Sequence, residues 1–268
     1  MVLPAGRPAL MGVLNVTPDS FSDGGLYLNP ANAYDAALRM VDEGADIIDV
    51  GGESTRPGAD SVDWQIELAR VRPVVDKLAK LGVPVSIDTS KPEVAEPCLE
   101  SGAQIINDVT ALRSPGMVEL AVSSGCTVCL MHMSGDPRTM QESPCYGCVV
   151  SEVKAYLAEK SNWAMAQGVR PGRIWVDPGI GFGKTVRHNL ELLAGLSGLC
   201  ELSHPVLIGV SRKSFIGKIL HDSPAHDRLE GTLAAQVVAQ VNGASVIRAH
   251  DVKSSRRAIE LTASVLGL

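Results

Sequence analysis

Short apolar runs alternate with amphipathic stretches along this chain. Each of eight runs has the length and the content of branched residues expected of a buried strand. After each run, apolar residues recur at the three- and four-residue spacing of a helix. The predicted strands are residues 9–15, 46–51, 83–88, 104–107, 127–133, 174–177, 206–210 and 245–248, and the predicted helices are residues 30–44, 64–81, 91–101, 114–124, 149–167, 189–199, 227–242 and 254–266.

Strands that alternate with helices form parallel sheets. Eight such units in 268 residues predict an α/β protein with one closed (β/α)8 TIM barrel, a single domain over residues 1–268. The loops after strands 1 and 2, residues 16–29 and 52–61, are long. The alternative is a doubly wound sheet, but that fold usually has fewer strands and a glycine-rich first turn, which residues 15–17 do not supply.

A six-residue pattern recurs three times and supports the barrel. It reads Gly44-Ala-Asp-Ile-Ile-Asp49, Gly102-Ala-Gln-Ile-Ile-Asn107 and Gly243-Ala-Ser-Val-Ile-Arg248. In each copy we expect the glycine to end a helix and the two branched residues to fill the barrel. The last residue changes from Asp to Asn to Arg while its surroundings stay the same. An active site on a shared frame would show this kind of variation.

The composition excludes several classes of partner. Only 4% of the residues are aromatic and the net charge is −6, so we expect neither nucleic acid nor an anionic membrane as a partner. The first residues lack the apolar core of a signal peptide, and no apolar run reaches membrane-spanning length. The expected location is cytoplasmic.

Two Cys-x-x-Cys pairs, Cys126 with Cys129 and Cys145 with Cys148, have the spacing of a zinc ribbon. One pair begins an apolar run, however, and the other pair follows it. Because a strand rises about 3.3 Å per residue, we expect the two pairs near opposite ends of the barrel. Four ligands at about 2.3 Å from one ion are then out of reach. Reduced, partly buried thiols are predicted instead.

Polar side chains follow nearly every predicted strand. In (β/α)8 enzymes the carboxyl ends of the strands share one mouth, which carries the chemistry. Each residue alone could equally be a helix cap or a solvated group. Together they favour a site, because a ring of buried polar groups without partners is costly. The residues expected there are Asn15, Asp49, Asp88, Asn107, His132, Asp177, Ser211, Arg212, Lys213, Arg248 and His250, with Asp19, Phe21, Thr55 and Arg56 from loops.

The chemistry of this set indicates a ligand with two parts. Asp88, Asn107 and Asp177 offer acceptors and one amide donor, which suit the adjacent N–H groups of an aminopyrimidinone edge. Several cations suit an anionic group such as a diphosphate. These cations are Arg56, Lys213, Arg248 and His250.

Asn15, with Asp19 from the following loop, offers oxygen atoms to Mg²⁺, an ion that keeps several waters and bridges phosphates. Other motifs fit less well. There is no Ser-His-Asp order and no Gly-x-Ser-x-Gly elbow. Residues 179–185 resemble a phosphate-binding loop, but they are one residue short of the Walker spacing and carry Pro178 in place of its first glycine. We therefore discount that loop.

Five longer stretches carry a family resemblance. They are Met11-Gly-Val-Leu-Asn-Val-Thr-Pro-Asp-Ser-Phe-Ser-Asp-Gly-Gly25, Gly51-Gly-Glu-Ser-Thr-Arg-Pro-Gly58, Asp177-Pro-Gly-Ile-Gly-Phe-Gly-Lys184, Ser211-Arg-Lys-Ser-Phe215 and Arg248-Ala-His-Asp251. With these stretches in this order, the chain resembles the dihydropteroate synthases. The resemblance implies a folate-pathway (β/α)8 transferase that joins 4-aminobenzoate to 6-hydroxymethyl-7,8-dihydropterin diphosphate and releases pyrophosphate.

The resemblance also implies roles for single residues. Pterin would be held by Asp88, Asn107, Met131, Asp177 and Lys213; the diphosphate by Asn15, Thr55, Arg248 and His250; and 4-aminobenzoate by Phe21, Arg56, Pro57, Phe182 and Ser211. Asn15 would bind Mg²⁺, and the catalytic residues would be Asp88, Lys213, Arg248 and His250. Sulfonamide inhibitors would bind on the aminobenzoate side, and a homodimer would form through the last helices. Two departures from the family pattern, at Ser134 and Ala249, change none of these contacts.

Two rival functions share the predicted pocket. A pterin-binding methyltransferase of the corrinoid type would need the same acids and amide, but not the cations of residues 211–213 and 248–250. A non-catalytic pterin-binding homologue would be expected to lose Asp19, Thr55 and Arg56 first, and all three are present. The sequence therefore favours the synthase.

Overall fold

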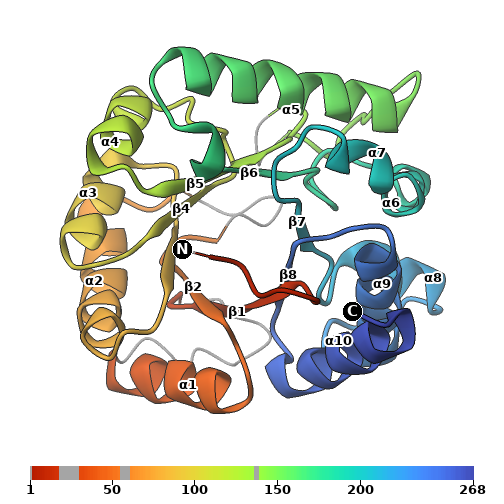
Figure 1. The fold of residues 1–268 in the computed structure, drawn as a ribbon, viewed down its shortest axis with the longest axis horizontal. Helices are drawn as coiled ribbons and strands as arrows, with labels where there is room; N and C mark the ends of the chain where they lie inside the picture. Colours follow the sequence, from red (N-terminus) through yellow and green to blue (C-terminus); the bar gives the residue numbers. More distant parts are fainter. Residues whose placement is uncertain (1, 18–29, 55–60, 136–138) are drawn as a thin grey trace.

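The structure is a computed structural model that describes residues 2–17, 30–54, 61–135 and 139–268. Within these ranges, parallel strands alternate with helices (Figure 1). The strands are β1 (Ala9–Asn15), β2 (Ile47–Gly51), β3 (Val85–Asp88), β4 (Ile105–Asp108), β5 (Thr127–Met131), β6 (Ile174–Asp177), β7 (Leu207–Gly209) and β8 (Val246–Ala249). The helices are α1 (Pro30–Asp42), α2 (Trp64–Lys80), α3 (Pro92–Glu100), α4 (Met117–Ser124), α5 (Val149–Ala166), α6 (Val186–Ala194), α7 (Ser197–Cys200), α8 (Ser214–Ile219), α9 (Leu229–Val241) and α10 (Val252–Leu266).

The eight strands form one closed sheet. They pair in the order β6-β5-β4-β3-β2-β1-β8-β7, and a parallel bridge between Val176 and Val206 joins the two ends of that order. Helices surround the ring of strands in Figure 1. The predicted (β/α)8 barrel is confirmed, and the doubly wound alternative is wrong. None of the helices in the described ranges is both long enough and apolar enough to pass through a membrane.

The predicted helix over residues 189–199 is wrong in its bounds. The structure divides it into α6, which begins at Val186, and the short α7, with Gly195 between them. Thr185 fixes the earlier start, because its hydroxyl accepts a hydrogen bond of 3.2 Å from the His188 amide. The short α8 has no counterpart among the predicted elements. Its six residues are too few for a periodic pattern to emerge.

The repeated pattern is confirmed at its glycines. Gly44, Gly102 and Gly243 have φ values of 102°, 111° and 96°, a region that favours glycine, and each follows a helix. The expectation that both branched residues fill the barrel is wrong. Successive residues of a strand point to opposite faces, so Ile47 lies inside the barrel and Ile48 packs toward the helices.

The interior of the barrel is filled by side chains over much of its height. Eight buried residues form this cluster, namely Ala9, Met11, Ile47, Ile105, Cys129, Trp175, Leu207 and Val246. Leu3 of the N-terminal segment packs against them, and Figure 1 shows that segment lying across the ring of strands. The inward-facing residues farther along the strands therefore lie at the other end of the barrel, where the strands finish.

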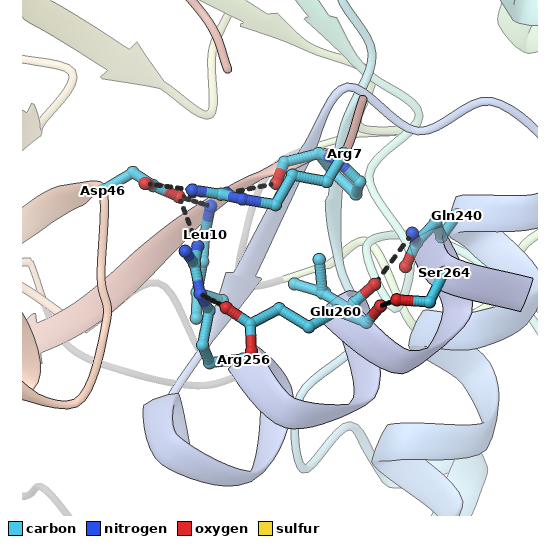
Figure 2. Close-up of polar contacts among 9 residues, drawn as sticks. Arg7, Leu10, Asp46, Gln240, Arg256, Glu260 and Ser264 are labelled. Carbon is cyan, nitrogen blue, oxygen red and sulfur yellow. Dashed lines mark hydrogen bonds and ion pairs between the residues drawn. The ribbon is translucent and has the colours of Figure 1, made fainter. Parts of the chain in front are cut away.

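A half-buried carboxylate connects three segments at the amino-terminal end of the strands (Figure 2). Asp46 accepts hydrogen bonds of 2.7 and 2.8 Å from Arg7, 2.8 Å from the Leu10 amide and 3.4 Å from Arg256. Burial acts to raise the pKa of Asp46, but the bonds from Arg7 and Leu10 outweigh it and lower the pKa overall. This end of the barrel is therefore closed by structural contacts.

Helix α9 packs through a polar face, contrary to the apolar stripe of Leu229, Leu233, Val237 and Val241 in its sequence. The residues it buries include Thr232, Gln236 and Gln240, and the Gln240 side chain donates to the Ile259 carbonyl of α10 over 3.1 Å. Val241 is 56% exposed. Helix α9 thus contacts α10 through the hydrogen bond of Gln240, and the stripe residues Leu229, Leu233 and Val237 are only half-buried.

Candidate active site

Four residues follow one another in register across β1 to β4 at the carboxyl ends of the strands. They are Asn15, Gly51, Asp88 and Asn107. Residues in register point to the same face of a sheet, here the inside of the barrel. A Cβ atom at Gly51 would lie 3.5 Å from the Asp88 Cβ and 3.7 Å from the Asn15 Oδ1. Glycine at this position therefore leaves room between the Asn15 amide and the Asp88 carboxylate.

Asp49 connects the polar residues of this wall. Its fully buried carboxylate accepts hydrogen bonds at Oδ2 from Asn107 over 3.1 Å and from Arg248 Nε over 2.6 Å. Arg248 Nη2 in turn donates to Asp88 over 2.7 Å. Asp49 thus joins the last residues of the other two repeat copies, which are predicted to form part of an active site.

Two acids share one guanidinium in this cluster. Burial raises the pKa of Asp88 to about 7; Arg248 opposes the increase, and the nearby Asp49 charge adds to it. The same two acids raise the pKa of Arg248 despite its burial, so it stays charged. Asp49 Oδ1 has no hydrogen-bond partner among the described atoms. The cluster therefore has spare acceptor capacity, which suits a ligand that donates N–H groups.

Asp177 ends β6 on the other side of the mouth, in register with Met131 of β5. Its Oδ1 accepts a hydrogen bond of 2.7 Å from the Gly179 amide. Only glycine fits there, because φ is +66° and a Cβ would lie 1.9 Å from the His132 carbonyl oxygen. Burial raises the pKa of Asp177, while the Gly179 N–H and the Lys213 charge oppose the increase.

Lys213 precedes α8 and lies beside this second acid. Its ammonium nitrogen is 4.2 Å from the centre of the Phe182 ring, a cation–π contact. Its charge and that of Arg248 both act on Asp177, so the two walls of the mouth share one electrostatic environment. An acid, a cation, an aromatic face and the Met131 side chain therefore line the β5–β7 side.

Ser211 and His250 are in contact at the same end of the barrel. The Ser211 hydroxyl accepts a hydrogen bond of 3.2 Å from the His250 amide and lies 3.0 Å from His250 Nδ1. The resemblance assigns these residues to two different ligands, 4-aminobenzoate and diphosphate. In the structure the serine is a hydrogen-bond partner of the histidine.

Two residues expected at the mouth lie elsewhere. His132 Nδ1 is 2.9 Å from Lys184 Nζ, and its ring packs edge-on against Tyr156 of α5 at 4.9 Å between ring centres. Arg212 forms an ion pair of 2.6 Å with Asp251. Placing them in the mouth was wrong because neighbouring residues at a strand end alternate in direction. Their neighbours, Met131 and Lys213, occupy the mouth instead.

Some predicted residues lie outside the described ranges. These are Asp19, Phe21, Thr55, Arg56 and Pro57, and their roles stay predictions. The two Cys-x-x-Cys pairs are described. Cys126 precedes β5 and Cys148 precedes α5, so they stand at opposite ends of the βα unit.

For two residues with contacts in or beside the site, the sequence predicts no function. The sequence predicts Asp49 at the mouth but indicates no function for it, although its position in the repeat, shared with Asn107 and Arg248, is a usable signal. Lys184 belongs to the discounted phosphate-loop motif. It is only 3% exposed, and burial lowers the pKa of its side chain to about 7. No sequence pattern indicates that a lysine after three glycines will be buried.

A (β/α)8 barrel with acids, an amide and a lysine around its mouth has the architecture of an enzyme that binds a small polar ligand at the carboxyl ends of its strands. Comparison with known families agrees, since residues 11–250 match the family described as pterin binding enzyme. Dihydropteroate synthase of Escherichia coli (strain K12) is 47% identical over 265 residues, 98% of this chain and 94% of that protein. The Mycobacterium leprae (strain TN) dihydropteroate synthase is 45% identical over 266 residues, 96% and 93% of the two chains.

Solved structures show the same relationship. The Yersinia pestis dihydropteroate synthase in a sulfonamide drug complex superposes with a TM-score of 0.97 at 44% identity, covering 100% of this chain and 98% of that one. The Xanthomonas albilineans enzyme in complex with 7,8-dihydropteroate superposes with a TM-score of 0.88 at 40% identity, covering 98% and 95%. The chain therefore belongs to the dihydropteroate synthases, within the pterin binding enzymes.

Proposed function

We propose that the chain condenses 4-aminobenzoate with (7,8-dihydropterin-6-yl)methyl diphosphate to give 7,8-dihydropteroate and pyrophosphate in folate biosynthesis. The observation that carries the proposal is that Asp88, Asn107, Asp177 and Lys213 gather at one barrel mouth in a dihydropteroate synthase. A transferase of this kind must hold the heterocycle rigidly while the bond at its exocyclic carbon is exchanged.

The pterin is assigned to the two acids and the residues between them. Asp88 and Asp177 would accept from its N–H groups, Asn107 would pair with a neighbouring donor or acceptor, and Lys213 would donate to a ring or carbonyl acceptor. Met131, in register with Asp177, would contact its face. Asp49 supports this assignment, because Asn107 and Arg248 both donate to its Oδ2 and leave its Oδ1 without a hydrogen-bond partner among the described atoms.

The diphosphate is assigned to Asn15, Thr55, Arg248 and His250. A Mg²⁺ site at Asn15 fits the chemistry of the donors, since its amide oxygen lies beside the Asp88 carboxylate across Gly51. The described residues hold no group of three or more His, Cys, Asp or Glu side chains able to bind a metal. An ion held by one or two protein oxygens, with phosphate and water, needs no such group. When bound, Mg²⁺ would neutralise charge on the leaving diphosphate.

The 4-aminobenzoate side is assigned to Phe21, Arg56, Pro57, Phe182 and Ser211. Phe182 supports this because its ring, under the Lys213 ammonium, gives a flat apolar surface beside the pterin residues. The Yersinia pestis dihydropteroate synthase forms a complex with a sulfonamide drug, and we assign sulfonamide inhibitors of this chain to the same side. The contact of 3.0 Å between the Ser211 hydroxyl and His250 Nδ1 supports a position for the serine between the two substrates.

The reaction replaces one bond with another. The C–O bond to the diphosphate breaks with its electron pair leaving on oxygen, the amine nitrogen bonds to the same carbon, and a proton is lost from the amine. Arg248 and His250 would stabilise the departing charge, an electrostatic effect worth several kcal/mol in enzymes. Asp88 and Asp177 would offset positive charge that develops on the pterin as the diphosphate departs.

A coupled assay for pyrophosphate release tests this function. Release should require both substrates, and Lys213→Ala should abolish pterin binding while the far-ultraviolet circular dichroism stays native. Release without 4-aminobenzoate would contradict the synthase. Methyl transfer to a corrinoid would support the methyltransferase, and pterin binding without turnover would support a non-catalytic homologue.

We also propose an oligomeric state and a cellular location from the family membership. A homodimer through the last helices is supported by apolar side chains exposed on α9 and α10, namely Val238, Val241, Leu261, Val265 and Leu266. A monomer mass in light scattering at micromolar concentration would contradict it. The cytoplasm is the proposed location, to be checked by fractionation.

A further inference from the structure

The loop between β6 and α6 is held by hydrogen bonds to three consecutive carbonyl groups. Each carbonyl oxygen receives a donor from a side chain that is not part of the mouth. The pairs are Gln141 Nε2 to Gly181 at 2.6 Å, Lys184 Nζ to Phe182 at 2.9 Å and Tyr146 Oη to Gly183 at 2.9 Å. Three glycines in the loop leave its backbone free to adopt other conformations. These side-chain contacts therefore select one of them.

Lys184 is the most buried of the three donors. Its ammonium contacts the Phe182 carbonyl and His132 Nδ1, both at 2.9 Å, and it is 3% exposed. Among the residues that the structure describes, no carboxylate lies within 4.0 Å of it. Burying a cation without an acid is costly. A buried ammonium in this position is better explained by the carbonyl it holds than by general stability.

His132 is the second anchor of this contact. Burial and the nearby Lys184 charge lower the pKa of His132 to about 3, so its ring is neutral and Nδ1 accepts the hydrogen bond from Lys184. The ring is itself held by Tyr156 of α5. Lys184 thus connects a fixed group at the end of β5 to the backbone of Phe182.

The side chain of Phe182 shows why this backbone position matters. Its ring lies 4.2 Å from the Lys213 ammonium, and a Cβ at the adjacent Gly181 would lie 3.2 Å from the Lys213 Cδ. The loop and Lys213 are therefore packed closely against each other. A shift of the Phe182 backbone would move the aromatic surface relative to the pterin residues.

We propose that Lys184 is a positioning residue for the 4-aminobenzoate side of the site, which acts by holding the Phe182 carbonyl so that the ring stays against Lys213. The proposal rests on the proposed function, because it takes Phe182 as a surface for 4-aminobenzoate. A misplacement of about 1 Å in such a surface can cost on the order of 100-fold in rate. The acids that hold the pterin lie on strands and should be little affected.

The test compares Lys184→Met with wild type and with Lys80→Met, an exposed lysine at the end of α2. Methionine removes the three hydrogen bonds of the ammonium and the buried charge but keeps the volume. We expect KM for 4-aminobenzoate to rise about tenfold or more. The dissociation constant for the pterin diphosphate, measured by calorimetry without 4-aminobenzoate, should stay within about twofold of the wild type. Lys80→Met should match the wild type in both.

Tyr146→Phe provides a milder second variant, since it removes only the hydroxyl that holds the Gly183 carbonyl. It should raise KM for 4-aminobenzoate by a smaller factor, and it decides the matter if Lys184→Met does not fold. Equal losses for both substrates, or an unchanged KM for 4-aminobenzoate, would overturn the proposal. Failure of the proposed function looks different, because the wild type itself would then release no pyrophosphate.

Discussion

Arg248 of β8 and Asp88 of β3 are joined by a hydrogen bond of 2.7 Å across the barrel mouth. The same guanidinium reaches Asp49 through Nε at 2.6 Å. Arg248 is thus oriented by two acids and cannot be treated as a mobile cation that merely attracts phosphate. Its direction, and with it the charge presented to the diphosphate, depends on residues assigned to the pterin.

Asp49→Asn tests this dependence. The substitution keeps the shape but removes the charge of a fully buried partner of Arg248. We expect the free energy of unfolding at pH 7 to fall by about 3 kcal/mol, as when one partner of a buried pair is lost. We also expect kcat/KM for the pterin diphosphate to fall at least about tenfold. Urea unfolding and steady-state kinetics measure the two effects, with the exposed Asp35→Asn as control. Wild-type values in both would rule out an orienting role.

The raised pKa of Asp88 predicts pH-dependent pterin binding. N–H donors bind the ionised carboxylate, and with a pKa of about 7 the ionised fraction grows as the pH rises from 6 to 8. The dissociation constant of a dihydropterin without diphosphate should therefore fall roughly tenfold over this range. Fluorescence titration measures it. Asp88→Asn should bind weakly and with no such dependence, whereas a wild-type affinity that is constant across the range would refute this account of Asp88.

The lowered pKa of Lys184 predicts that the free energy of unfolding depends on pH. Its pKa is about 7 in the folded protein against an ordinary 10.5, so between these values the folded state binds fewer protons than the unfolded state. The free energy of unfolding therefore rises with pH in this window, by up to about 1.4 kcal/mol per pH unit. Below pH 7 the buried lysine is charged in the folded protein and destabilises it by its full amount. Relative to Lys184→Met, the wild type should become more stable from pH 7 to 9 in urea unfolding. Parallel pH curves for the two proteins would exclude the shift.

Gly179→Ala and Gly82→Ala form a matched pair of tests. Both glycines have a positive φ, 66° at Gly179 and 73° at Gly82. A Cβ at Gly179 would lie 1.9 Å from the His132 carbonyl oxygen, whereas a Cβ at Gly82 would have no atom within 4 Å. Gly82→Ala should cost only the left-handed backbone penalty, about 1–2 kcal/mol. Gly179→Ala should also displace Asp177 and abolish pterin binding in calorimetry. Near-equal effects of the two on binding would show that the β6 end tolerates movement.

Much of the barrel could be predicted because its causes are local. Each strand and helix shows its own periodicity, and Gly44, Gly102 and Gly243 mark helix ends through a backbone conformation that favours glycine. Inward-facing residues such as Asp88 and Asp177 could be placed at one mouth because parallel strands in a barrel all finish at the same end. The family resemblance then linked those residues to a pterin.

Contacts between distant parts of the chain could not be predicted in this way. The direction of His132 and Arg212, the burial of Lys184, and the polar face of α9 depend on which neighbours the folded chain supplies. The same applies to Asp49, whose partners Asn107 and Arg248 are 58 and 199 residues away along the chain. The sequence by itself determined the eight βα units and the chemistry at their ends. Only the tertiary structure decided which of those groups form hydrogen bonds or ion pairs with one another and which are buried. The reason is that hydrogen bonds and desolvation act over a few ångströms in space, whatever the separation of the residues along the chain.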